Sequence, residues 1–195
     1  MSPSEFLTTR QAAARLGFSL GTIQNMVESG KLEAWKTSGG HRRIPLAAVE
    51  ALLAQRKAGY VSTPTADAPI DILVSEDDPT LQLLYQLTIE DWGLPITLRM
   101  TSNGFESLLE VGKRKPDILI ADLMMPGMDG FEMIRQLRAD PALKSMDILV
   151  VSAMDRAEIE KQGLPPNITI FAKPIPFHEI KGFVLGQLAV RKKQA

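Results

Sequence analysis

Residues 116–130 of the chain read PDILIADLMMPGMDG. Four consecutive apolar residues at 118–121 lie between two aspartates, and a bounded apolar run of this length is typical of a buried strand. The segment after Asp122 contains a proline and two glycines, which favour a loop before the next helix. The stretch therefore predicts a buried strand that ends in a carboxylate.

Further apolar runs lie on both sides of this segment and alternate with helical patterns. The runs are at 70–74, 96–100, 148–151 and 168–172, and the helical patterns are at 80–91, 104–112, 130–139, 157–162 and 177–190. Five strands that alternate with five helices predict an α/β fold with a doubly wound, five-stranded parallel sheet. Ligands of such sheets bind beyond the carboxyl ends of the strands.

Polar side chains come directly after four of the predicted strands. Glu76 and Asp77 follow the first strand, Asp122 the third, Ser152 the fourth and Lys173 the fifth. Three carboxylates that meet at one edge of the sheet repel one another, and Mg²⁺ would offset their charge because it prefers carboxylate, water and phosphate oxygens. A hydroxyl and an ammonium group can then contact a bound phosphoryl group, with Asp122 as a carboxylate nucleophile.

Residues 70–190 resemble a response-regulator receiver domain, the partner of sensor histidine kinases in two-component signalling. The resemblance rests on four ordered motifs: ILVSEDDP at 72–79, PDILIADLMMPGMDG at 116–130, VVSA at 150–153 and KPI at 173–175. It implies a flavodoxin-like sheet in a phosphoprotein.

The same resemblance implies a role for each residue of the site. Asp122 would accept the phosphoryl group, and Mg²⁺ would be held by Glu76, Asp77, Asp122 and the backbone carbonyl of Met124. Ser152 and Lys173 would contact the phosphoryl group, and the Lys173–Pro174 peptide would be cis. We expect Asp78, which precedes Pro79, to cap a helix rather than to bind metal.

One position departs from the family pattern. Receivers usually carry an aromatic switch residue three positions before the lysine, and here that residue is Ile170. Phe171 is adjacent, but neighbouring residues on a strand point to opposite faces. The usual coupling from Ser152 to the surface is therefore in question.

The first 58 residues differ in charge from the rest of the chain. They carry eight basic and four acidic side chains, a net charge of +4, which leaves −5 for the remainder of a chain whose total is −1. A basic segment favours a polyanionic partner. The absence of cysteine excludes disulfides and thiolate metal sites. Since no apolar run approaches the roughly 18 residues of a membrane span, we expect a cytoplasmic protein with no membrane partner.

Two short helical patterns lie in this basic segment. Thr8 and Gln11 fit a capping box for a helix at 9–16, and Ser19 can cap a second helix at 20–28. Two short helices joined by a tight turn form the helix-turn-helix pattern. Segments 32–36 and 41–44 then flank TSGG at 37–40, which predicts a β-hairpin before a third helix that begins near Pro45.

Residues 6–56 resemble the winged helix-turn-helix domains of the MerR/excisionase-like group. The resemblance rests on LTTRQAAARLG at 7–17, Thr22-Ile23 in the second helix and the wing SGGHRRIP at 38–45. It implies binding to double-stranded DNA. Glutamine and asparagine can read adenine in the major groove, and basic wing residues can contact phosphates. The candidate DNA-binding residues are Thr22, Gln24, Asn25, Lys36, His41, Arg42 and Arg43.

The role of several of these residues is open. Thr22, Gln24 and Asn25 are expected to face outward, whereas Ile23 and Met26 face the core. His41 fits a turn-forming role as well as DNA contact. We expect Trp35 to pack on the third helix.

These patterns predict a winged helix-turn-helix domain at 1–58, a linker at 59–69 and a receiver domain at 70–195. The leading hypothesis is a DNA-binding response regulator in which phosphorylation of Asp122 by a histidine kinase changes dimerisation or domain contacts, and so DNA binding and transcription. We expect a homodimer on DNA or on phosphorylation.

Two other classes of protein are alternatives. One is a protein-interaction adaptor with an inert receiver pocket, independent of phosphorylation. The other is a magnesium-dependent phosphatase of the haloacid-dehalogenase type, which would need a second aspartate two positions after Asp122, where the chain has Met124. We therefore expect a regulator and not an enzyme.

Overall fold

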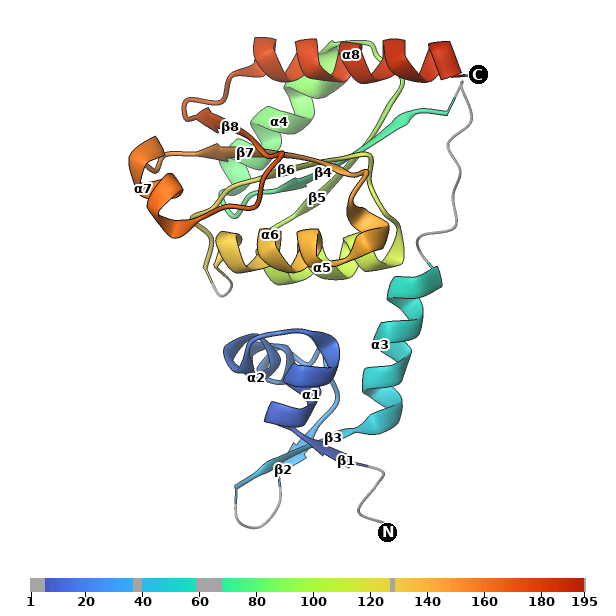
Figure 1. The fold of residues 1–195 in the computed structure, drawn as a ribbon, viewed down its shortest axis with the longest axis vertical. Coiled ribbons are helices and arrows are strands. Elements are labelled where there is room, and N and C mark those ends of the chain that lie inside the picture. The colour runs from blue at the N-terminus through green and yellow to red at the C-terminus, as the bar shows by residue number, and fades with distance from the viewer. Residues whose placement is uncertain (1–5, 37–39, 59–67, 127–128, 195) are drawn as a thin grey trace.

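The computed structural model describes residues 6–36, 40–58, 68–126 and 129–194, with the side chains of 55–58 and 194 excepted. The chain forms a small N-terminal domain and a larger α/β domain, which lie one above the other in Figure 1. Among the described residues, no helix combines the length and the apolar character that a membrane crossing requires. The predicted linker falls largely on residues 59–67, and the turn of the wing on 37–39; both lie outside the described residues.

The N-terminal domain consists of three helices and a three-stranded antiparallel sheet in the order β1-β3-β2. Its elements are β1 (Phe6–Thr8), α1 (Thr9–Leu16), α2 (Leu20–Glu28), β2 (Trp35–Lys36), β3 (Arg42–Pro45) and α3 (Leu46–Ala58).

The sequence places both ends of the first helix. Both hydrogen bonds of the capping box between Thr8 and Gln11 are present, and Gly17 ends the helix in the left-handed conformation, at φ +72°. The side chain of Ser19 accepts a hydrogen bond from the Thr22 N–H at the start of α2. Helices α1 and α2 therefore have the predicted bounds.

The larger domain has a parallel five-stranded sheet in the order β5-β4-β6-β7-β8. Its strands are β4 (Ile70–Ser75), β5 (Ile96–Thr101), β6 (Ile118–Ala121), β7 (Asp147–Ser152) and β8 (Thr169–Ala172). Its helices are α4 (Pro79–Asp91), α5 (Gly104–Lys113), α6 (Gly130–Ala139), α7 (Arg156–Gln162) and α8 (Phe177–Gln194), with a 3₁₀ turn at Pro141–Leu143. The doubly wound α/β fold with a preceding helix-turn-helix domain is confirmed.

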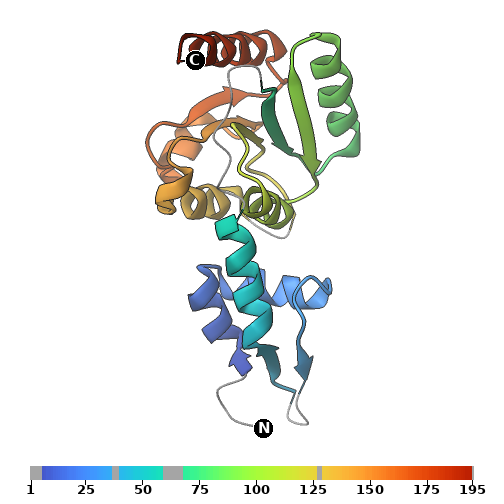
Figure 2. The same cartoon turned by 90° about the vertical axis from the view of Figure 1, so that its right-hand side faces the viewer.

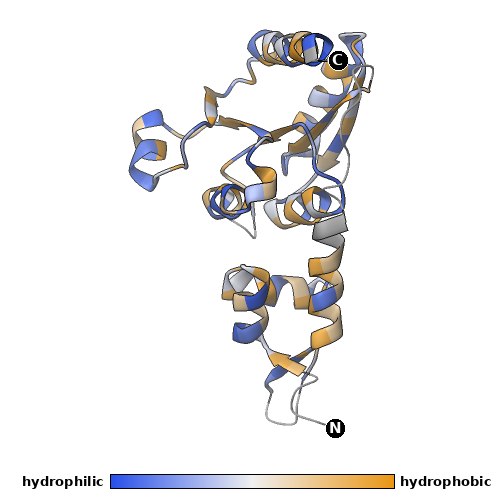
Figure 3. Cartoon of the chain, turned by 45° about the vertical axis from the view of Figure 1, so that its right-hand side comes forward, coloured by the Kyte–Doolittle hydropathy of each residue, from blue (hydrophilic) through white to orange (hydrophobic). Residues whose placement is uncertain are grey.

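Helices cover both faces of this sheet. Figure 1 shows α4 and α8 on one face, α5 and α6 on the other, and α7 at the end near β8. The strands appear mostly apolar in Figure 3, whereas α7 is largely polar. All six residues of strand β4 are buried. This is typical of a parallel sheet, because helices cover both of its faces.

The small domain lies against the α5–α6 side of the receiver. Helix α3 contacts α5, as the turned view in Figure 2 shows. The buried residues of the small domain and of this side of the receiver form one continuous hydrophobic cluster. The opposite side of the sheet has its own cluster beneath α4 and α8.

Three features differ from the sequence expectation. Strand β1 was not predicted, because it has only three residues and is held by pairing with β3, about 37 residues away. The 3₁₀ turn after α6 was also missed. Trp35 does not pack as expected: it is 40% exposed, and its ring contacts Phe6 of β1 at a centroid distance of 4.2 Å.

Candidate functional site

Three carboxylates gather at the carboxyl edge of the receiver sheet. Glu76 and Asp77 follow β4, and Asp122 follows β6, the neighbouring strand. Ligand oxygens of the three side chains lie within 4.8 Å of one another. Glu76 is only 2% exposed and Asp122 6%, so the cluster is largely withdrawn from water. The predicted convergence of these residues is confirmed.

Lys173 joins two of the carboxylates. Its Nζ lies 2.7 Å from Asp122 Oδ2 and 2.9 Å from Glu76 Oε2. Burial alone lowers the pKa of Lys173, but the hydrogen bonds to Asp122 and Glu76 outweigh burial and raise that pKa above its ordinary value. The ammonium group is therefore held charged beside Asp122.

The backbone around Asp122 orients its carboxylate. The N–H of Met124 donates to Asp122 Oδ1 at 3.0 Å, while Lys173 binds Oδ2. Gly130 lies against this segment so closely that a Cβ atom there would sit 2.6 Å from Leu123 Cα and 2.9 Å from the Asp122 carbonyl oxygen. Glycine at the start of α6 therefore allows the chain after β6 to fold back under Asp122.

Ser152 lies at the end of β7, fully buried, and its Oγ accepts a hydrogen bond from the Met154 N–H. Ile170 packs into the cluster on the α5–α6 side of the sheet, and Phe171 packs on the opposite side. Phe171 therefore does not take the place of the missing aromatic residue. The Lys173–Pro174 peptide is cis, as the receiver resemblance implied.

Asp78 is a helix cap. Its side chain accepts a hydrogen bond from the Thr80 N–H at 2.7 Å. This hydrogen bond lowers the pKa of Asp78 and outweighs burial, which acts in the opposite direction. The expectation that Asp78 caps α4 is confirmed. The same loop is fixed by Gln82, whose side chain donates to the Glu76 carbonyl.

A buried hydroxyl chain adjoins the acidic cluster. Ser75 Oγ donates to the Met125 sulfur at 3.3 Å and receives a hydrogen bond from Ser107 Oγ, which lies 2.7 Å from Thr101 Oγ1. Sequence reasoning missed this chain. The signal was the position of Ser107 beside Leu108 on the inner face of α5, where a polar residue needs buried partners.

The α2 candidates differ in their exposure. Ile23 and Met26 are fully buried, as expected, and Asn25 is exposed, with Gln24 partly so. The prediction that Thr22 faces outward is wrong. Thr22 is only 3% exposed, because its hydroxyl bonds Ser19 Oγ at 2.8 Å and its side chain lies on the side of α2 that meets the receiver.

The wing carries the remaining candidates. Lys36 and His41 are exposed, and Arg42 and Arg43 are partly exposed on β3. The Lys36 and Arg42 positions pair across β2 and β3. Arg42 also bonds Glu28 at the end of α2, at 2.6 Å. This ion pair joins the wing to the end of α2.

The geometry of the larger domain defines a receiver: a parallel sheet with an acidic cluster and a lysine at its carboxyl edge. The sequence model of the response regulator receiver domain matches residues 72–184, more than half of the chain, so the chain belongs to this family. A second model, of a helix-turn-helix domain, matches residues 6–57. The chain therefore combines a receiver with a helix-turn-helix domain.

Curated relatives match the receiver part. An uncharacterized 14.6 kDa protein from Leptolyngbya boryana is 35% identical over 109 residues, which cover 55% of this chain and 82% of that protein. The response regulator Rre1 of Synechocystis is 27% identical over 62% of this chain, and the match spans 52% of its own length.

Solved structures match the same part. A response-regulator crystal structure from Chloroflexus aurantiacus has a TM-score of 0.53 and 30% identity, covering 62% of this chain and 98% of that one. The receiver domain of a sensor histidine kinase from Pseudomonas aeruginosa, solved with a magnesium ion coordinated in its active-site cleft, has a TM-score of 0.54 and 20% identity. It covers 63% of this chain and 99% of that one.

Proposed function

We propose that this chain is a DNA-binding response regulator whose Asp122 accepts a phosphoryl group from a sensor histidine kinase. The observation that carries the proposal is the position of Lys173, whose ammonium group lies between Asp122 and Glu76 at the carboxyl edge of the sheet. A charged lysine in this place can follow the extra negative charge from the carboxylate to a phosphoryl oxygen.

The chemistry assigned to Asp122 is a phosphoryl transfer. A carboxylate oxygen of Asp122 forms a bond to phosphorus as the bond between phosphorus and the kinase histidine nitrogen breaks, and that nitrogen keeps the electron pair. Asp122 is held for this attack by the Met124 N–H and by Lys173. Ser152 contacts the transferred group from β7.

The acidic cluster fits Mg²⁺. Glu76, Asp77 and Asp122 offer oxygen ligands within 4.8 Å of one another, and the backbone carbonyl of Met124 is the proposed fourth protein ligand. Bound Mg²⁺ would neutralise charge on the phosphoryl group during transfer. The magnesium in the related Pseudomonas receiver supports this assignment.

The second part of the proposal is DNA binding by α2 and the wing. Gln24 and Asn25 read base edges, and Lys36, Arg42 and Arg43 contact phosphates, with His41 and Thr22 beside them. The basic charge of residues 1–58 supports a nucleic-acid partner. Phosphorylation changes domain contacts or homodimerisation and thereby DNA binding.

The pairing of a receiver with a helix-turn-helix domain fits a regulator rather than an enzyme. The alternative of an adaptor with an inert pocket is not favoured, because the acidic cluster and Lys173 are assembled as a phosphoryl site requires.

Asp122→Asn tests the phosphoryl site. We expect wild-type protein to bind beryllofluoride only with Mg²⁺, and Asp122→Asn to bind none, because a neutral amide oxygen is a much weaker ligand for beryllium than a carboxylate oxygen. Fluorine NMR measures the bound species. Asp91→Asn, which removes one exposed carboxylate at the end of α4, is the matched control and should bind normally. Binding by Asp122→Asn would contradict the site.

Selection of genomic DNA fragments by the purified chain tests DNA binding. The fragments are sequenced with and without Mg²⁺ and beryllofluoride. A motif enriched more strongly with beryllofluoride supports a phosphorylation-controlled regulator. The same motif at equal enrichment in both samples would mean that DNA binding does not depend on the receiver site. No enriched motif in either sample would remove DNA from the proposal.

A further inference from the structure

Part of the surface of α2 that its own domain leaves uncovered faces the receiver. A groove of about 380 Å³ lies between α2 and the receiver. On one wall are Thr22 and Asn25 of α2, and on the other are Asn103, Phe105 and Pro126 of the receiver. The side of α2 that carries Thr22 and Asn25, two of the candidate DNA-binding residues, is therefore turned toward the receiver.

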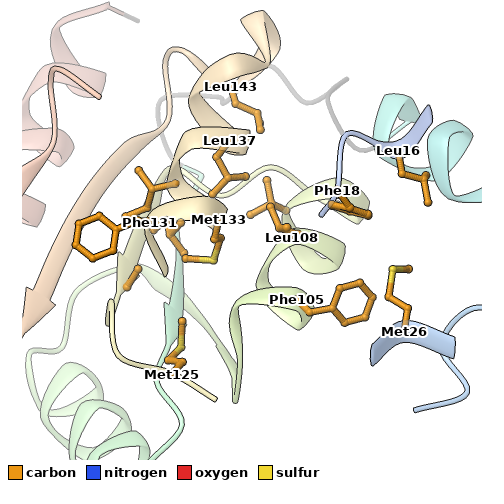
Figure 4. Close-up of a cluster of buried hydrophobic side chains, with 14 of the residues drawn as sticks. Leu16, Phe18, Met26, Phe105, Leu108, Met125, Phe131, Met133, Leu137 and Leu143 are labelled. Carbon is orange, nitrogen blue, oxygen red and sulfur yellow. The ribbon is translucent and has the colours of Figure 1, made fainter. Parts of the chain in front are cut away.

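An aromatic contact anchors the two domains beside this groove. Phe18, in the turn before α2, and Phe105, at the start of α5, are both buried, and their rings meet edge to face at 6.3 Å. Figure 4 shows the Phe105 side chain pointing toward Met26 of α2, with Phe18 beside it. The contact holds the receiver against this side of α2.

Two receiver carboxylates bind groups of the small domain that suit a phosphate. Glu132 of α6 accepts a hydrogen bond from the Ser19 backbone N–H, directly before α2, at 3.1 Å. Glu106 of α5 pairs with Lys31, whose ammonium also lies 5.3 Å from the centroid of the Phe105 ring. Backbone N–H groups at helix starts and lysines are common phosphate ligands in DNA complexes.

We propose that the α5–α6 face of the receiver is a docking surface for α2 and occupies it in place of DNA. Phe105 forms the apolar centre of this surface, and Glu106 and Glu132 substitute for DNA phosphates. The occupant is the helix-turn-helix domain of the same chain, which the structure places there, and opposite net charges of the two parts favour the contact. The inference rests on the proposed function and adds how the receiver excludes DNA from α2.

The docking surface adjoins the phosphoryl site. Pro126 of the groove wall follows Met125, whose sulfur accepts the hydrogen bond of Ser75, the residue before Glu76. Ser75 in turn bonds Ser107 of α5, two residues after Phe105. A shift of the loop after Asp122 therefore reaches the docking surface through these contacts. This route does not need the aromatic switch residue that is usual in receivers and that Ile170 replaces here.

Removal of the two carboxylates tests the docking. The full chain with Glu106→Gln and Glu132→Gln is compared with a control carrying Glu158→Gln and Glu160→Gln on the exposed side of α7, which loses the same charge. The probe is a labelled duplex from the genomic selection, or a random-sequence duplex. We expect the first variant to bind at least about tenfold more tightly than the control, because a larger fraction is open. Equal affinities of folded variants overturn the proposal.

A cross-link supplies the opposite change. Because the chain has no cysteine, Lys31→Cys with Glu106→Cys can be joined by a bis-maleimide without side reactions. We expect the joined protein to bind the duplex at least about tenfold more weakly than the same variant capped with a monofunctional maleimide, a difference of about 1.4 kcal/mol. The control joins Arg156→Cys to Glu160→Cys within α7.

The two experiments separate the inference from the function on which it rests. Equal affinity of joined and capped protein overturns the docking proposal while DNA binding stands. If no variant, including the carboxylate variant, binds any duplex, the proposed function falls and the inference falls with it. In that case the cross-linking yield still measures whether the domains meet in solution.

Discussion

At the scale of single residues, the receiver site depends on a position that has no side chain. Gly130 has no functional group, yet its backbone lies against the segment that carries Asp122. Interiors are packed too closely to accept an added methyl group without displacement. The orientation of the Asp122 carboxylate is thus set partly from α6.

Gly130→Ala tests this contact. We expect a loss of about 1–3 kcal/mol in the free energy of unfolding and weaker beryllofluoride binding, because the added Cβ displaces the backbone at Leu123. Denaturant unfolding and fluorine NMR measure the two effects. Gly182→Ala in α8, where no atom lies within 4 Å of the added Cβ, is the control and should gain up to about 1 kcal/mol. Similar results for both would remove the role of Gly130.

A second residue, Asp147, has a measurable pH signature. Burial at the start of β7 raises its pKa above 3.8, Asp117 adds to this, and Arg138 opposes it. The folded chain therefore binds this proton more tightly than the unfolded chain, and stability contributed by the protonated form is lost as the pH rises from 3.8 through the raised pKa.

Asp147→Asn should therefore stabilise the receiver at pH 7, by less than about 1 kcal/mol because the side chain is partly exposed to solvent. The gain should shrink as the pH falls toward 3.8. The new amide side chain retains an oxygen acceptor for Gln187, which bonds Asp147 at 2.6 Å. Thermal unfolding at both pH values is the measurement. Asp117→Asn, which loses the ion pair with Arg191, should be destabilised at pH 7; a destabilised Asp147→Asn would contradict the assignment.

At the scale of elements, local patterns predicted most of the fold. Strand β6 has its predicted bounds because an apolar run is closed on both sides by aspartate, and α1 and α2 have theirs because of their caps. The acidic site was also predictable, since the ends of parallel strands meet at one edge. The rest depended on contacts between distant segments.

Strand β1 and the burial of Thr22 are examples of such contacts. The three residues of β1 form a strand only because β3 lies beside them. Thr22 has the sequence context of an exposed helix position, and the receiver that meets this side of α2 is absent from any local pattern. The hydroxyl chain through Ser107 likewise joins three elements.

The wing is the element whose role is simplest to measure. Arg42→Ala with Arg43→Ala should weaken DNA binding and reduce the slope of log affinity against log salt by roughly two, one for each lost phosphate contact. Binding titrations at several salt concentrations give the slope. Arg156→Ala with Lys161→Ala on α7 removes the same charge from a distant surface and should leave the slope unchanged. An unchanged slope in the wing variant would take the wing out of the interface.

At the scale of the whole molecule, two domains share one hydrophobic cluster and also carry opposite charges. If phosphorylation at Asp122 loosens the docking of α2, the molecule must become more extended. We expect Mg²⁺ with beryllofluoride to increase the radius of gyration of wild-type protein measured by small-angle scattering, and Asp122→Asn to show no increase. An increase in both proteins, or in neither, would mean that the arrangement of the domains does not depend on the phosphoryl site.

Thr22 and Asn25 lie on the helix that we propose reads DNA and also in the groove against the receiver. A mutation at either position then alters two equilibria together: the preference for an operator and the strength of the restraint. Over evolutionary time, a substitution at these positions that adapts the protein to a new operator sequence also changes the degree of phosphorylation at which the regulator responds. Target choice and sensitivity would be inherited as one trait.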